Sequence, residues 1–134
     1  MAVLLIDVAN VVGSRPDGWW RDRAGATGRL LARLAALDGR TLVGPDGGLG
    51  RREEVVAVVE GRARDVPLVA PVRLVRAPGS GDDALAAEAA SLAADGRRVL
   101  VVTVDRGLRA RLPAAVDVTG RGWLLARLDE VAAG

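Results

Sequence analysis

The chain alternates between short, unbroken apolar runs and longer stretches in which Leu, Val or Ala recurs at helical spacing. The short runs predict buried strands, which we place at 3–7, 40–43, 72–75, 98–104 and 116–118. The longer stretches predict helices at 24–37, 51–64, 82–94, 107–112 and 123–131. This alternation predicts an α/β fold with three α/β/α layers and a mostly parallel, five-stranded sheet. We expect a single domain over 1–134.

Two of the predicted strands end in a carboxylate, at Asp7 and at Asp105. If these strands are neighbours, both side chains lie at the carboxyl edge of the sheet, where open α/β sheets bind ligands. Asp82 and Asp83 open the helix after the third strand, and the connection can bring them over the same point. Like charges held so close need a cation between them or a shared proton. The alternative is structural, because Asp is also favoured at helix caps and in first helical turns.

The missing residue types restrict the chemistry more than those present. The chain has no His and no Cys, and its 19 basic residues are all Arg. Imidazole bases, thiolate nucleophiles, Schiff bases and the P-loop lysine are therefore excluded. Any catalysis is left to carboxylates, acting as an acid/base pair or as ligands of a hard cation.

Charge and hydropathy bear on location and partners. The formal net charge of +2 indicates modest cationic character rather than a polycationic surface. No apolar run approaches the roughly 18 residues of a membrane span, so we expect no membrane partner. The absence of cysteine fits a reducing, cytoplasmic location.

Two loops carry features that suit nucleic acid or phosphate. The loop at 13–23 holds adjacent tryptophans flanked by arginines, which can stack on bases and contact phosphates. The alternative is that at least one tryptophan covers the core. The glycine-rich loop Gly44–Gly50 predicts a flexible connection, with a phosphate cradle as the weaker alternative.

Three short motifs, in this order, resemble those of the PIN-like superfamily, and its NYN ribonuclease domains most of all. They are Asp7-Val8-Ala9-Asn10, Gly81-Asp82-Asp83-Ala84-Leu85 and Val102-Thr103-Val104-Asp105-Arg106-Gly107-Leu108. The resemblance spans most of the chain. It implies a parallel sheet in the order 3-2-1-4-5, with the first and fourth strands side by side.

The resemblance also implies roles for the acidic residues. Asp7 is expected to be the first-strand metal ligand, with Asn10 as the polar residue that follows it. Asp83, with Asp82 as second choice, is expected to be the helix-start acid, and Asp105 the fourth-strand acid. PIN domains usually have a further acid from the middle of the chain, and the alternatives for it are Glu53, Glu54 and Glu88.

The function implied is a metal-dependent endoribonuclease that uses Mg²⁺ or Mn²⁺ to hydrolyse RNA. One alternative is an RNA-binding module without turnover, suggested by Val8, which stands where related sequences more readily have a small residue. Another is the toxin of a toxin–antitoxin pair. RNA is the expected partner, and a homodimer is allowed. The expected RNA contacts are Arg15, Trp19, Trp20, Arg21, Arg23 and Arg106.

Overall fold

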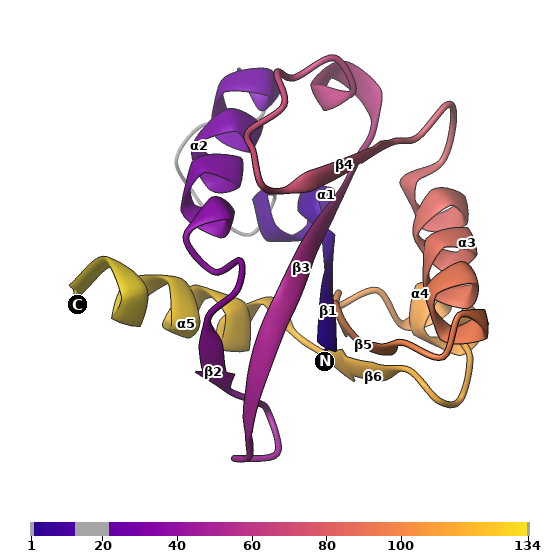
Figure 1. The fold of residues 1–134 in the computed structure, drawn as a ribbon. Coiled ribbons are helices and arrows are strands. Elements are labelled where there is room, and N and C mark those ends of the chain that lie inside the picture. Colours follow the sequence, from indigo (N-terminus) through magenta and orange to yellow (C-terminus); the bar gives the residue numbers. More distant parts are fainter. Residues whose placement is uncertain (1, 13–21, 134) are drawn as a thin grey trace.

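The computed structural model describes residues 2–12 and 22–133, and it has an α/β fold (Figure 1). Its elements are β1 (Ala2–Asp7), α1 (Val8–Val12), α2 (Arg23–Ala35), β2 (Thr41–Val43), β3 (Leu49–Val59), the 3-10 helix η2 (Gly61–Ala63), β4 (Arg73–Arg76), α3 (Gly81–Ala94), β5 (Arg98–Val102), α4 (Arg106–Arg111), β6 (Asp117–Thr119) and α5 (Arg121–Ala133). The predicted alternation of strands and helices is recovered except in the second quarter of the chain.

The helix predicted at 51–64 is wrong, because residues 51–59 belong to the long strand β3 and η2 follows at 61–63. Its apolar half, Val55 to Val59, is buried at every position, with at most 3% of any side chain exposed. A run buried on both faces suits a strand inside a sheet, and the β-branched valines favour that conformation. The spacing of these valines also matches one face of a helix, and this is the origin of the error.

β1 lies at the centre of the sheet, parallel to β3 on one side and to β5 on the other. β6 pairs in parallel with β5, and β4 pairs in parallel with β3. β2 pairs with the first residues of β3 in the antiparallel direction, so the sheet is mixed although mostly parallel. The expected neighbourhood of the first and fourth predicted strands, now β1 and β5, is confirmed.

The expected strand order 3-2-1-4-5 is not matched. The path through the sheet is β2-β3-β1-β5-β6, with β4 attached to β3. The predicted second strand, 40–43, corresponds to β2, which pairs with β3 rather than with β1. β3 takes the place beside β1 that the prediction had assigned to that strand.

The two faces of the sheet are covered by different helices, which makes three layers (Figure 1). Leu4 and Ile6 of β1 pack with residues of α1, α2 and α5 in one core. Val3 and Leu5 pack with α3 and α4 in the other core. Because β1, β3, β5 and β6 are parallel, their carboxyl ends meet at one edge of the sheet. Within the described ranges, no helix has the length and apolar character needed to cross a membrane.

Candidate active site

A cavity of about 420 Å³ opens at the carboxyl edge of the sheet. Four of its lining side chains are carboxylates, each delivered by a different element, and they are Asp7, Glu60, Asp82 and Asp105. The other described residues of the lining are Ala9, Asn10 and Arg121. The parallel strands thus bring together the two strand-end aspartates, Asp7 and Asp105, as their positions predicted.

Asp7 is the most buried of the acids, with 8% of the residue exposed. The Asn10 side-chain amide donates a hydrogen bond of 2.7 Å to its Oδ2, and the Thr103 hydroxyl donates another of 2.9 Å. Burial raises the pKa of Asp7 above its ordinary value of 3.8, and the nearby charge of Glu60 acts in the same direction. The two hydrogen bonds oppose this shift without cancelling it. Asp7 is therefore held in place in a setting that disfavours its charge.

The Asp105 side chain has two roles in the structure. Its Oδ1 accepts a hydrogen bond of 3.0 Å from the Leu108 backbone N–H, so it caps α4 as the structural alternative expected. Its side chain also lines the cavity. The Thr103 hydroxyl accepts a hydrogen bond of 3.2 Å from the Asp105 backbone N–H. Capping and participation in the acidic site are therefore compatible.

Asp82, rather than Asp83, lines the cavity. Burial raises the pKa of Asp82, and the charges of Asp105, Asp7 and Glu60 raise it further. The Asp83 carboxylate is 71% exposed and pairs with Arg111 at 2.7 Å. Asp83 was the preferred helix-start acid, but the side chain that lines the cavity is that of its neighbour on α3, Asp82.

Glu60 is the acid that sequence reasoning missed. It follows the buried run of β3 directly, just as Asp7 ends β1, and it lines the same cavity. Its Oε2 accepts a hydrogen bond from the backbone N–H of Gly81, the first residue of α3. A Cβ built on Gly81 would lie 2.5 Å from that oxygen, so a side chain there would displace the carboxylate. The misread helix at 51–64 concealed this strand-end acid.

The three glutamates that were alternatives for one further acid lie elsewhere. Glu54 and Glu88 both pair with Arg73, and Glu54 also pairs with Arg97 at 3.2 Å. Glu53, also on β3, is absent from the cavity lining. Glu54 and Glu88 belong to an ion-pair network on the sheet and α3, and none of the three glutamates lines the acidic cavity.

The cationic side chains around the site differ from those expected. Arg15, Trp19, Trp20 and Arg21 lie outside the described residues. Arg23 is the first residue of α2, and Arg106 is the exposed first residue of α4. Arg121, which the sequence analysis did not select, lines the cavity from the first turn of α5. Its position directly after β6, at the same sheet edge, is the signal that could have identified it.

The donor set suits a hard divalent cation, because every acidic ligand is a carboxylate oxygen. Within residues 2–12 and 22–133, however, no three carboxylates are arranged as a group that could hold a metal ion. The hydrogen bonds explain this spread. Asp7 is held by Asn10 and Thr103, Asp105 caps α4, and Glu60 binds the first amide of α3. The residues fit the chemistry of a metal site, while hydrogen bonds to other groups of the protein hold three of the four carboxylates.

No protein-family model matches the chain, and no curated protein sequence matches it. Among solved structures, the fold is similar to the crystal structure of a variant of Rae1 (YacP) from Bacillus subtilis. The likeness has a TM-score of 0.70 and covers 99% of this chain and 78% of the Rae1 chain. Only 17% of the aligned residues are identical. The two chains therefore share a fold.

Proposed function

We propose that the chain is a metal-dependent endoribonuclease of the PIN-like superfamily, which hydrolyses RNA at the acidic cavity. The observation that carries this proposal is the convergence of Asp7, Glu60, Asp82 and Asp105 on one cavity at the carboxyl edge of the sheet. The fold shared with Rae1 supports a nuclease-like role in general. The motifs around Asp7 and Asp105 suggest the NYN branch, which stays a prediction.

The four cavity acids are the residues that would hold Mg²⁺ or Mn²⁺. A divalent cation at such a site activates water and neutralises charge that develops on a phosphodiester. We assign the helix-start role to Asp82, because Asp83 is paired with Arg111 away from the cavity lining. Asn10 and Thr103 act as positioning residues, since both donate hydrogen bonds to the Asp7 carboxylate.

Arg121 is our first candidate for contact with the RNA backbone. Among the described residues, its side chain is the one guanidinium in the lining of the acidic cavity. A cation beside four carboxylates reduces the repulsion that a phosphate would meet on approach. Arg106 follows Asp105 directly and offers a second contact from the surface. Binding of RNA, a homodimer and a cytoplasmic location stay predictions.

A second candidate function is an RNA-binding module that keeps the fold without turnover. The observation that favours it is the spread of the carboxylates, no three of which form a metal-holding group among the described residues. This module would bind RNA in a salt-dependent manner, because phosphate contacts release counterions. It would bind equally well with EDTA and with Mn²⁺.

The test is cleavage of end-labelled RNA, both structured and unstructured, in Mn²⁺, Mg²⁺ or EDTA. We expect cleavage with a divalent cation, none with EDTA, and loss of cleavage in Asp105→Asn. The control is Asp129→Asn. It alters an exposed carboxylate of α5 that pairs with Arg33 of α2. Metal-independent binding without any cleavage would support the binding module instead.

A further inference from the structure

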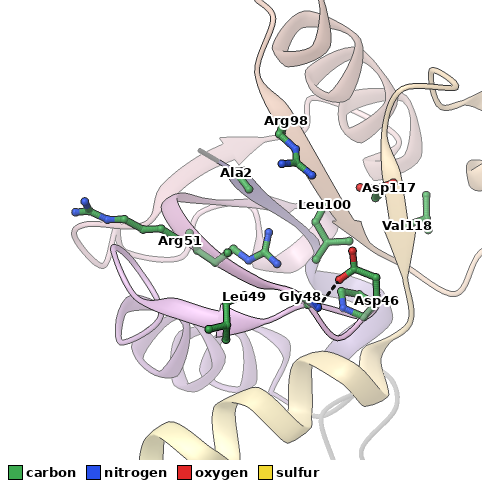
Figure 2. Close-up of a pocket in the computed structure, with 13 residues that line it drawn as sticks. Ala2, Asp46, Gly48, Leu49, Arg51, Arg98, Leu100, Asp117 and Val118 are labelled. Carbon is green, nitrogen blue, oxygen red and sulfur yellow. Dashed lines mark hydrogen bonds between the residues drawn. The ribbon is translucent and has the colours of Figure 1, made fainter.

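A second pocket of about 420 Å³ lies at the opposite, amino edge of the sheet (Figure 2). The loop between β2 and β3 forms one wall, and the first residues of β1, β5 and β6 form another. Figure 2 shows Arg98 on one side of this space and Asp46 and Gly48 of the loop on the other. No part of the acidic cavity contributes to the lining of this pocket.

The central feature of the pocket is Arg52, a charged side chain of which only 6% is exposed. Its Nε is buried and has no hydrogen-bond partner among the described residues. The guanidinium lies 5.7 Å from the centre of the Trp123 ring, and the Trp123 indole is anchored by a hydrogen bond to the Val43 carbonyl. Burial lowers the pKa of Arg52. A buried charge without a hydrogen-bonded counterion is costly, and an anionic ligand would remove that cost.

The pocket lining has charged residues of both signs. Arg51, Arg52 and Arg98 line it, against Asp46 and Asp117. In the part of the chain that the structure describes, none of these three arginines has a carboxylate oxygen within 4.0 Å of its nitrogens. The Asp46 Oδ1 instead accepts a hydrogen bond of 2.9 Å from the Gly48 backbone N–H. The Arg51 side chain points away from the space between Arg98 and Asp46 (Figure 2), since neighbouring residues of a strand alternate between its faces. Arg52 and Arg98 are therefore the guanidinium groups that the pocket offers, and the charges of Asp46 and Asp117 act on Arg52 without an ion pair.

The glycine-rich loop helps by leaving room rather than by donating its amides. The Gly44 N–H is bonded to the Gly48 carbonyl, and the Gly47 N–H is bonded to the Gly44 carbonyl. These amides are therefore unavailable to a phosphate, unlike those of a backbone cradle. A Cβ on Gly44 would lie 3.0 Å from the Asp46 Oδ1 and 3.4 Å from the Arg52 Nη2, so the glycine leaves room for the loop to pack close to these two side chains.

We propose that this pocket binds the phosphate group of a small phosphorylated molecule of about nucleotide size, with Arg52 and Arg98 as its main ligands. Guanidinium groups pair with phosphate oxygens through two parallel hydrogen bonds, which gives strong and oriented binding. The volume falls within the range of about 300–1,000 Å³ found for small-molecule sites. Leu100 and Val118 supply apolar surface for the rest of the ligand.

The experiment measures the melting temperature and the calorimetric binding of the full chain with inorganic phosphate, AMP or adenosine at matched ionic strength. We expect phosphate and AMP to raise the melting temperature above the chloride control, and adenosine to leave it unchanged. Arg98→Gln should weaken AMP binding by roughly tenfold, the loss expected for one charge-assisted contact. Because Arg98 is exposed, this variant should fold even if Arg52→Gln does not.

Two further variants make the result decisive. Arg109→Gln removes an exposed arginine of α4 outside the pocket and should bind AMP as the wild type does. Asp105→Asn should also bind AMP normally, since it alters only the acidic cavity. The proposal is overturned if phosphate and AMP give no gain over chloride, if Arg98→Gln binds AMP normally, or if Asp105→Asn loses AMP binding.

A 5′-phosphorylated trinucleotide separates the two sources of such a phosphate. If AMP binds more tightly than the trinucleotide, the pocket is assigned to a free small molecule, as proposed. If the trinucleotide binds more tightly and Arg98→Gln removes the difference, the small-molecule assignment is wrong and the pocket holds the end of an RNA chain.

Discussion

The Thr103 hydroxyl donates a hydrogen bond of 2.9 Å to the Asp7 carboxylate across the boundary between β5 and β1. The Thr103 hydroxyl oxygen also accepts a hydrogen bond of 3.2 Å from the Asp105 backbone N–H. Thr103 is 1% exposed, so it connects the two strand-end acids inside the protein. One buried hydroxyl group therefore links the Asp7 carboxylate to the backbone of Asp105, in addition to the pairing of β1 with β5.

Replacing Thr103 with valine should destabilise the protein by about 1–3 kcal/mol, because the buried Asp7 carboxylate loses a hydrogen-bond donor while side-chain size is kept. The measurement is urea unfolding at neutral pH. Thr41→Val, on the exposed edge strand β2, is the matched control and should change the free energy of unfolding little. An equal loss of unfolding free energy in both variants would mean that the Thr103 hydrogen bond to Asp7 does not stabilise the protein.

The raised pKa values of Asp7 and Asp82 predict how stability depends on pH. A carboxyl group whose pKa is higher in the folded state than the ordinary 3.8 prefers to fold in its protonated form. Its ionisation then costs stability above the folded pKa, and this cost disappears as pH falls toward 3.8. In metal-free protein, Asp82→Asn should therefore raise the melting temperature at pH 7.

The advantage of Asp82→Asn over the wild type should shrink as the pH is lowered, since the wild-type carboxyl group becomes neutral as well. Asp95→Asn, at the C-terminal end of α3, gives a comparison outside the cavity. Thermal melts in EDTA between pH 4 and 7 provide the test. A lower melting temperature for Asp82→Asn at pH 7 would contradict the repulsion among the cavity acids.

The contact between Gly81 and Glu60 predicts an effect of adding one methyl group. In Gly81→Ala the new Cβ would meet the Glu60 carboxylate, which must leave the start of α3. If Glu60 serves the proposed reaction, Mn²⁺-dependent cleavage should fall by roughly tenfold or more, as misplaced catalytic groups commonly cause. Gly79→Ala is the control, because a Cβ there meets nothing within 4 Å. Equal cleavage rates in the two variants would show that the position of Glu60 does not matter for the reaction.

The burial of Arg52 predicts that removing its charge stabilises the ligand-free protein. Arg52→Met keeps most of the side-chain volume and removes a buried guanidinium whose Nε is unpaired among the described residues. We expect the ligand-free protein to become more stable by about 1 kcal/mol, after the loss of the contact with Trp123. Arg109→Met is the exposed comparison. Chemical denaturation in phosphate-free buffer measures both, and a marked loss of stability in Arg52→Met would show that the guanidinium is structurally required.

Much of the fold and half of the acidic site follow from simple strand patterns. Asp7 and Asp105 each follow an apolar run, and parallel strands place such residues at one edge. Glu60 has the same pattern, but the valines before it fit a helix as well as a strand, and this ambiguity removed it from consideration. Long strands of this kind are identified by their pairing with β1, which a single sequence does not display.

The choice between Asp82 and Asp83 could not come from sequence. Consecutive residues on a helix point about 100° apart, so the answer depends on how α3 docks on the sheet. The locations of Arg121 and Arg52 likewise depend on how distant segments of the chain pack together. Arg121 reaches the acidic cavity because α5 begins directly after β6, and Arg52 lies under α5 beside Trp123.

The most direct test of the central claim compares Asp82→Asn with Asp83→Asn in Mn²⁺-dependent RNA cleavage. The two variants change neighbouring residues of the same helical turn in the same way, and only Asp82 lines the acidic cavity. The ion pair lost in Asp83→Asn is exposed and contributes little stability. We predict that Asp82→Asn abolishes cleavage while Asp83→Asn retains the wild-type rate. Retained cleavage in Asp82→Asn, or its loss in Asp83→Asn alone, would contradict the assignment of the active site to this cavity.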